Sequence, residues 1–221
     1  HDLRTPLTSL KGFIEVLVNG DYESEDKYRE YLGILDSEAD RMISLLNDLL
    51  DLGRLESGKL ELNLERLSLF DLLTYTISSM KGLASRKGVS LKLNADDARE
   101  LFVTADRRRL LQVMVNLLSN AIDFSPEGGT VEILLRRDGK AAVVEVRDEG
   151  PGVPAEERER IFEKYHQTQR VSSDRGKGSG LGLAIVKRIM DLHGASISME
   201  ERGERQGSRF LDGHRCLVGE P

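Results

Sequence analysis

Apolar residues recur every three or four positions in two stretches near the start of the chain, residues 3–17 and 28–49. This spacing predicts two amphipathic helices, each with one apolar seam that faces a partner helix. Residues 19–26 between them are acidic and contain Gly20, so this stretch is predicted to be the connection. The predicted seam residues are Leu3, Leu7, Leu10, Ile14 and Leu17 in the first helix, and Tyr28, Leu32, Leu35, Ala39, Met42, Leu46 and Leu49 in the second.

Two such helices leave apolar surface uncovered on the side away from each other. A second copy of the hairpin would cover it, which predicts an α-helical hairpin that forms a dimeric four-helix bundle. The alternative is an intramolecular helix pair covered by the rest of the chain. Gly53, Ser57 and Gly58 are typical of a helix end, so the first module is predicted to span residues 1–60.

The rest of the chain mixes helical and strand patterns. Helical spacing over residues 67–85 is followed by strand-like stretches at 88–94 and 101–104. Asp106 is then placed to cap an amphipathic helix that continues through Phe124. This alternation of helices and strands indicates an α/β module.

A β-hairpin is predicted next, because residues 130–136 and 141–147 alternate around Asp138 and Gly139. The sequence next predicts a short helix that ends near Tyr165 and a longer helix over residues 184–193. Residues 211–221 lack apolar alternation. The second module is therefore predicted to span residues 64–212, and residues 213–221 are a tail to which the sequence assigns no role.

Two amides interrupt the apolar face of the helix that Asp106 caps. Asn116 and Asn120 lie four residues apart, hence on one side of the helix. Two unpaired amides would be costly there unless they meet a ligand or each other. The pair is therefore a candidate binding feature, although structural Asn pairs also occur in helices.

Asp148 follows the second hairpin strand and precedes Gly150 and Gly152. A carboxylate at such a strand end can accept a hydrogen bond from an exocyclic amine, while the glycines let a flat ring approach the backbone. The alternative is a simple turn.

A glycine-rich string, residues 178–183, opens the last predicted helix. Backbone N–H groups and the positive end of the helix dipole favour phosphate at such a position. Neither a closely preceding strand nor the later acidic residue of a dinucleotide fold is present, and the Walker pattern is absent. Residues 166–177 before it are polar and poor in apolar anchors, which is typical of a mobile lid.

The chain begins with His1, Asp2, Leu3, Arg4, Thr5 and Pro6. His1 and Thr5 share a helix face off the apolar seam, and Asp2 is close enough to accept the imidazole proton. Pro6 lacks an N–H, so a kink is expected at the Asp2 carbonyl. A terminal histidine is also what a tag remnant or a truncation leaves.

HDLRTPLTSL resembles the phospho-acceptor box of sensor histidine kinases of two-component signalling. In the same order as in that family, NLLSN, DEGPGV, IFEKY and GSGLGLAIVKRI resemble the N, first glycine, F and second glycine boxes of its ATP domain. The resemblance implies a phospho-acceptor dimerisation domain followed by a catalytic ATP-binding domain. The implied fold of the latter is an α/β sandwich, helices on one face of a mixed sheet, similar to gyrase, Hsp90 and MutL.

The resemblance also implies roles for individual residues. Asn116 and Asn120 would hold Mg²⁺ and phosphate oxygens, and Asp148 would bind the adenine amine. Phe162 would anchor the lid and the contact between domains. The remaining residues implied to bind ATP are Gly150 and Gly152 at the adenine, Gly178, Gly180 and Gly182 at the phosphates and lid, and Phe124, Lys177 and Leu181.

The implied function is autophosphorylation of His1 from Mg-ATP, assisted by Asp2, and transfer to an aspartate of a response regulator. In the family a hydroxyl or amide at the Thr5 position orients the water that dephosphorylates the regulator, so phosphatase activity is expected as well. The implied assembly is a homodimer through the hairpin. One rival is a clamping ATPase of the gyrase or chaperone type, and another is a degenerate kinase that acts as a scaffold.

Asp123 departs from the family pattern. Asp123 stands where the N box usually has a basic residue. One turn from Asn120, its carboxylate would repel a triphosphate unless it meets Mg²⁺ or a lid cation such as Arg175 or Lys177.

Composition narrows the partners. The 221 residues carry a net charge of -6, which argues against a nucleic-acid surface, so the arginines at 107–109 and 136–137 are interpreted as solvated faces. The only cysteine, Cys216, excludes an internal disulfide. No apolar run approaches the 18 or so residues of a membrane span. We therefore expect a cytoplasmic fragment of a longer protein, attached to a membrane only through segments outside this chain.

Overall fold

The computed structural model describes residues 4–56, 61–95, 98–139, 141–166, 180–201 and 208–215. The chain divides into two compact units, His1–Gly58 and Lys59–Pro221.

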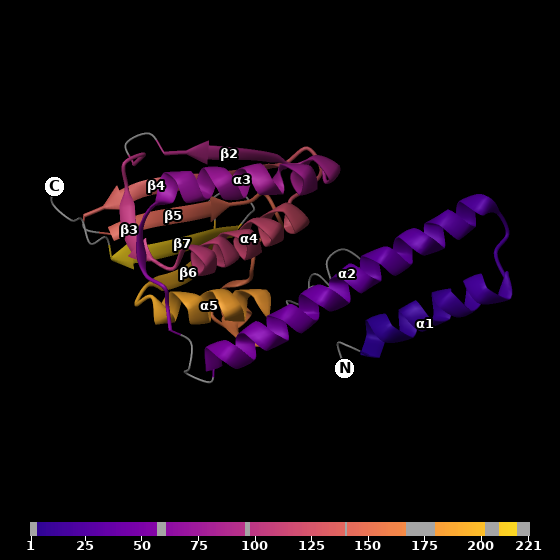
Figure 1. Cartoon of the computed structure of the whole chain (residues 1–221). Coiled ribbons are helices and arrows are strands. Elements are labelled where there is room, and N and C mark those ends of the chain that lie inside the picture. The colour runs from indigo at the N-terminus through magenta and orange to yellow at the C-terminus, as the bar shows by residue number, and fades with distance from the viewer. Residues whose placement is uncertain are drawn as a thin grey trace. The chain divides into compact units, whose positions relative to one another are not determined.

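The first unit is a hairpin of helices α1 (Arg4–Asn19) and α2 (Glu25–Glu56), as predicted (Figure 1). The Phe13 and Tyr31 rings pack between the helices with centroids 5.4 Å apart. Near the turn, the Tyr22 and Tyr28 centroids lie 5.2 Å apart. Aromatic contacts therefore close the hairpin at the turn end, where α1 and α2 are connected.

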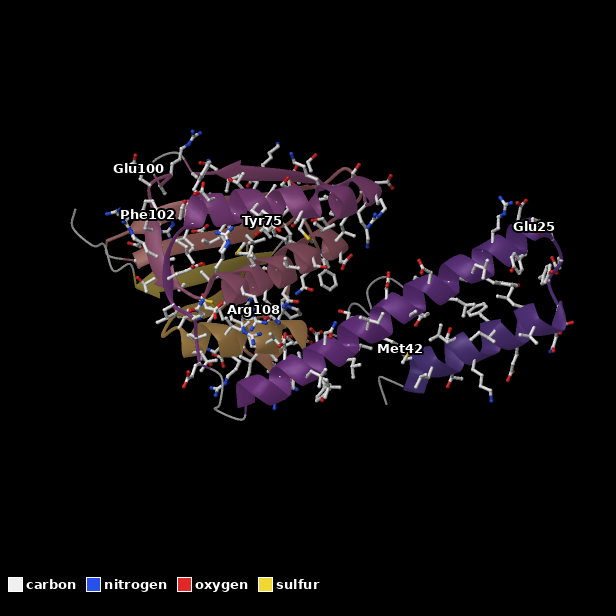
Figure 2. The ribbon with its side chains drawn as sticks, viewed as in Figure 1. Glu25, Met42, Tyr75, Glu100, Phe102 and Arg108 are labelled. Carbon is white, nitrogen blue, oxygen red and sulfur yellow. The ribbon has the colours of Figure 1, made fainter. Side chains whose placement is uncertain are left out.

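Both ends of α2 differ from the prediction. The Ser24 hydroxyl accepts a hydrogen bond from the Lys27 amide (3.3 Å), so Glu25, placed in the connection from sequence, begins the helix (Figure 2). Acidic residues are favourable in a first helical turn. At the other end, α2 continues through Gly53 to Glu56, because one glycine costs a helix interior only about 1 kcal/mol. The kink expected at Asp2 lies outside the described residues.

The second unit is the predicted α/β sandwich. Its main sheet has the order β2-β4-β5-β7-β6, with β2 and β4 parallel and the other pairs antiparallel. Figure 1 shows helices on one face of this sheet. The sheet strands are β2 (Ser90–Asn94), β4 (Thr130–Asp138), β5 (Ala141–Arg147), β6 (Ser196–Glu201) and β7 (Ser208–Arg215), and the helices are α3 (Leu69–Arg86), α4 (Arg107–Phe124) and α5 (Gly182–Leu192).

A small second sheet pairs β1 (Glu65–Ser68) with β3 (Phe102–Ala105) antiparallel. Phe102 lies on this sheet (Figure 2), with the Arg66 guanidinium 4.4 Å from its ring centroid. The prediction of a helix from residue 67 was wrong at its start. Leu67 belongs to β1, and Ser68 caps α3 by accepting the Asp71 amide (3.2 Å).

The core lies between the helices and the main sheet. Alternate residues of β4 and β5 on the helix face are buried, and so are Ile197 and Met199 of β6, a strand that we did not foresee. The short helix expected before residue 165 is instead two 3₁₀ turns, η1 (Ala155–Glu157) and η2 (Arg160–Phe162). Strand β7 continues to Arg215, past the expected end of the module at residue 212.

The other face of the sheet carries a buried carboxylate, Glu145, which is only 1% exposed. Arg147 donates to one of its oxygens (2.6 Å) and Arg136 to the other (3.1 Å), and Arg136 also pairs with Asp138 (3.1 Å). The hydrogen bonds from Arg136 to Glu145 and Asp138 raise the pKa of Arg136 above its usual value, and the bond to Glu145 has the larger effect. Arg136 is therefore held by two carboxylates of the same hairpin, Glu145 and Asp138.

Candidate active site

Helix α4 carries the two candidate amides, and its start is fixed by Asp106. One carboxylate oxygen accepts the Arg109 amide (3.1 Å) and the other accepts the Asn63 amide (3.0 Å). Burial alone would raise the pKa of Asp106, but these hydrogen bonds and the Arg108 charge lower it below its usual value. The hydrogen bonds that cap α4 therefore favour the ionised form of Asp106.

The same cap is tied to the end of α5. The Asp106 amide donates to Nε2 of His193 (3.0 Å), and Nδ1 of the same ring lies 2.8 Å from the Ile189 carbonyl oxygen. This link holds α4 against α5. Sequence reasoning missed it, because nothing in the chain near His193 indicates a partner 87 residues away.

Asn116 faces the start of α5. Its side-chain oxygen lies 3.1 Å from the place that a Cβ would occupy at Gly182, the first residue of α5. Asn120 is one turn further along the same helix face and is partly buried. Leu181, at the N-cap position, makes no side-chain cap hydrogen bond to α5, so the amide face of α4 lies beside a helix N-terminus that its own N-cap side chain does not cap.

Asp148 lies at the end of β5 and is 2% exposed. Its Oδ1 accepts the Gly150 amide (2.8 Å). A Cβ at Gly150 would lie 2.8 Å from that oxygen and 2.9 Å from the Phe124 carbonyl oxygen, distances that only glycine permits. Gly152 has φ +70°, in the left-handed region that favours glycine. The predicted Asp148, Gly150 and Phe124 are thus brought together from β5 and the end of α4.

The ends of the predicted lid are joined by backbone. The Tyr165 amide donates to the Gly180 carbonyl oxygen (2.9 Å), and Gly180 has φ +63°. A Cβ at Gly180 would lie 2.9 Å from the Tyr165 backbone, so glycine is required at this contact. Leu181 is buried next to it, and Phe162, in η2, is partly buried.

Asp123 has a partner that we did not expect. Its Oδ1 lies 2.8 Å from Nζ of Lys87, at the end of α3. The lid cations proposed for it, Arg175 and Lys177, lie outside the described residues, as does Gly178.

The phospho-acceptor site is only partly described. Thr5 lies in the first turn of α1, whereas His1 and Asp2 fall outside the described residues.

Among the residues that the structure covers, no helix is both long and apolar enough to cross a membrane. Within the same coverage, no group of three or more His, Cys, Asp and Glu side chains could hold a metal ion.

Comparison with known families agrees with both units. Residues 1–58 match the His Kinase A (phospho-acceptor) domain, and residues 105–211 match the family of histidine kinase-, DNA gyrase B- and HSP90-like ATPases. A phospho-acceptor domain followed by an ATPase domain of this type defines a histidine kinase core. The chain belongs to the sensor histidine kinases, as its sequence boxes predicted.

Individual relatives support this assignment. The sensor histidine kinase WalK of Bacillus subtilis is 33% identical over 208 residues, which cover 92% of this chain and 34% of WalK. The histidine kinase ThkA, solved in complex with the response regulator protein TrrA, is similar with a TM-score of 0.78 and 26% identity, over 97% of this chain and 58% of that one. Full-length ShkA, solved in complex with AMPPNP, has a TM-score of 0.71 and 29% identity, over 100% of this chain and 45% of that one.

The chain thus spans about a third of the length of WalK.

Proposed function

We propose that this chain is the catalytic core of a sensor histidine kinase that phosphorylates its own His1 from Mg-ATP. The observation that carries the proposal is that the Asn116 side chain faces Gly182 at the N-terminus of α5, with its Oδ1 3.1 Å from the place that a Cβ of Gly182 would occupy. The N-terminus of a helix favours phosphate, and amide side chains beside it can bind phosphate oxygens or their counter-ion.

The adenine of ATP would bind at the end of β5. Asp148 is buried and its Oδ1 is held by the Gly150 amide, so the carboxylate has a fixed direction from which to accept the adenine amine. Gly150 and Gly152 would shape the loop beside the ring, because Gly150 packs closely against Asp148 and Phe124 and Gly152 has a left-handed φ. Phe124 would border the same site, which is supported by the close approach of its backbone to Gly150.

The phosphates would bind at the start of α5, where Gly180, Leu181 and Gly182 present backbone amides. Lys177 and Gly178, which precede them in sequence, would complete this site from the lid. The Tyr165–Gly180 hydrogen bond supports this placement, because it anchors both ends of the lid segment beside α5.

The residues on α4 fit Mg²⁺. The Asn116 and Asn120 side chains offer amide oxygens, which are hard donors of the kind that Mg²⁺ accepts together with phosphate oxygens and water. When bound, the ion would offset negative charge on the phosphates.

The His1 imidazole would act as the nucleophile. A nitrogen–phosphorus bond forms to the γ-phosphorus while the bond from that phosphorus to the bridging oxygen of ADP breaks, and ADP leaves. Asp2 would accept the ring proton, so that the attacking nitrogen keeps its lone pair. The phosphoryl group would then pass to an aspartate of a response regulator, and Thr5 would orient the water that later hydrolyses that aspartyl phosphate.

The hairpin would dimerise into a four-helix bundle. Several seam residues that were predicted to be buried are exposed in the single chain: Leu7 is 52%, Ile14 is 49% and Leu46 is 53% exposed. Burying apolar surface of this kind contributes about 25 cal/mol per Å². A second copy of the hairpin is the partner with the matching seam, and the phospho-acceptor family of residues 1–58 supports it.

The regulator and the cellular site are proposed from the family. That ThkA was solved in complex with the response regulator TrrA supports a receiver domain as the partner here. We place this core in the cytoplasm, with any membrane attachment through segments outside this chain.

Three outcomes of one experiment separate this function from its rivals. The chain is incubated with Mg-ATP labelled in the γ-phosphate, and bound nucleotide, protein-bound label and free phosphate are measured. A kinase binds ATP and becomes labelled. A clamping ATPase releases phosphate with no labelled protein, and a degenerate scaffold binds no ATP.

An Asp148→Asn variant is the control, because it retains the shape of the side chain and removes the carboxylate proposed to bind adenine. It should lose labelling through weaker ATP binding. Labelling of this variant at the wild-type rate and ATP concentration would contradict the proposed adenine site.

A further inference from the structure

Two electrostatic effects disfavour a carboxylate at the position of Asp123. It lies in the last turn of α4, where the helix dipole disfavours negative charge, and that turn contains no basic residue. Asn116, Asn120 and Asp123 are spaced i, i+4 and i+7, so Asp123 shares the helix face proposed to meet the phosphates. An acidic residue at this place needs a compensating cation.

Lys87 is that cation. Its Nζ lies 2.8 Å from Asp123 Oδ1, and the two side chains are 47% and 36% exposed. An ion pair between side chains this exposed usually contributes little to stability, because water also solvates both charges. The fold, however, limits where Lys87 can go.

The backbone of Lys87 is fixed beside the end of α4. Its amide caps α3 through the Leu83 and Ala84 carbonyl oxygens (3.2 and 3.1 Å). The next residue, Gly88, accepts the Gly128 amide (2.9 Å) from the loop that follows α4. Since Lys87 and Asp123 sit on elements joined in this way, their pairing is set by the fold.

A further carboxylate faces the same corner. Glu127 Oε1 lies 3.7 Å from the place that a Cβ would occupy at Gly88. Without Lys87, the last turn of α4 and the loop that follows it would carry the negative charges of Asp123 and Glu127 without the charge of Lys87 to offset them.

We propose that Lys87 and Asp123 form a charge pair that sets the affinity of the site for the triphosphate of ATP. Lys87, at the end of α3, neutralises Asp123 and so offsets the negative charge in the last turn of α4, which contains no basic residue of its own. The inference rests on the proposed ATP site. It predicts opposite effects for the two partners, since loss of Lys87 exposes the carboxylate to the phosphates and loss of Asp123 leaves the ammonium to attract them.

The expected size follows from Coulomb's law in a solvated site. Neighbouring helix turns place Cβ atoms about 5–6 Å apart, so the charge lies within about 10 Å of a group held by Asn120. At that separation near a protein surface, one unit of charge changes the affinity for a multiply charged anion by about three- to tenfold.

The test measures equilibrium binding of Mg-ATP, Mg-ADP and adenosine to the full chain and to Lys87→Met, Asp123→Asn and the double variant. Lys87→Met should weaken Mg-ATP binding about three- to tenfold, and Asp123→Asn should strengthen it by a similar factor. The double variant should bind within about twofold of the unaltered chain. Adenosine binding should not change, because adenosine has no phosphate, and the shifts should shrink at about 0.5 M salt.

Matched controls come from the hairpin. Lys27 and Glu30 form an ion pair at 2.7 Å with 45% and 52% exposed side chains. Lys27→Met and Glu30→Gln make the same changes in net charge and should leave ATP affinity unchanged. In autophosphorylation, the Lys87 and Asp123 variants should change KM for ATP with little change in kcat.

Two results would overturn this inference but not the ATP-binding function. In the first, the unaltered chain binds ATP, but the two single variants change the ATP affinity in the same direction or not at all. In the second, the variants change the affinities for adenosine and ATP equally. Failure of the unaltered chain to bind any of the three compounds would overturn the ATP-binding function and this inference together. Thermal unfolding of each variant shows whether it is folded under the binding conditions.

Discussion

Gly150 is the position where one added methyl group should most directly disturb the proposed adenine site. In Gly150→Ala the new Cβ would lie 2.8 Å from Asp148 Oδ1, 2.9 Å from the Phe124 carbonyl oxygen and 3.2 Å from Phe124 Cβ. Two of these three atoms belong to the end of α4, which cannot rotate away as a flexible side chain would. Asp148 or the end of α4 must therefore move.

The magnitude follows from the contacts that change. Overpacking of this kind costs about 1–3 kcal/mol in the free energy of unfolding. If the Asp148 carboxylate shifts, the adenine amine loses a hydrogen bond to a charged group, which contributes about 1.5–3 kcal/mol. Since about 1.4 kcal/mol corresponds to tenfold, Mg-ATP should bind about ten- to a hundredfold more weakly.

Urea unfolding and equilibrium ATP binding measure the two effects separately. The control is Gly82→Ala, about one turn before the end of α3, where an added Cβ meets nothing within 4 Å. That change should stabilise the protein by about 0.5–1 kcal/mol and leave ATP binding unchanged. A Gly150→Ala protein with unaltered ATP affinity would refute the reasoning that this turn forms the adenine pocket.

Three further predictions concern other parts of the molecule. Gly182→Ala should raise KM for ATP in autophosphorylation at a stability cost below about 1 kcal/mol, because the nearest atom, Asn116 Oδ1, can yield by side-chain rotation; unchanged KM would contradict the proposed phosphate site. Asp106→Asn should lower the free energy of unfolding at pH 7 by about 1–2 kcal/mol, since an amide cannot accept both the Arg109 and Asn63 hydrogen bonds. The pKa of Asp106 is lowered in the folded state, so its stabilisation is present above the unfolded pKa of about 3.9 and is lost as pH falls through the folded pKa. Urea unfolding should therefore show that the difference in free energy of unfolding between the unaltered protein and Asp106→Asn shrinks below about pH 4. A difference that stays constant with pH would be inconsistent with this. Thr5→Ala should abolish dephosphorylation of a receiver domain that the chain has phosphorylated while autophosphorylation is retained, and equal loss of both activities would remove the role proposed for Thr5.

The sequence predicted those features that depend on neighbouring residues. Apolar periodicity identified α1, α2 and α4, and the alternation around Gly139 identified the hairpin of β4 and β5. Asp148 and Gly150 could be linked in advance because the hydrogen bond between them spans two residues. The order of the boxes then gave the family and the α/β sandwich, and both are confirmed.

The sequence could not predict which distant elements meet. Nothing local indicates that Asn116 faces Gly182, that Asp106 binds His193 or that Asp123 pairs with Lys87, because helical periodicity defines a buried face without naming its partner. The errors at element boundaries have a similar cause. Leu67 fits a helical pattern as well as a strand, and only its pairing with Val103 in the small sheet decides between them.

The most direct test of the central claim is the position of the phosphoryl group after incubation with Mg-ATP. Peptide mapping by mass spectrometry under alkaline conditions, which preserve phosphohistidine, should place it on His1. The label should be lost in acid and absent from His1→Gln, although that variant still binds ATP. A chain that binds Mg-ATP normally yet carries no phosphoryl group on His1, or carries it on another residue, would contradict the account.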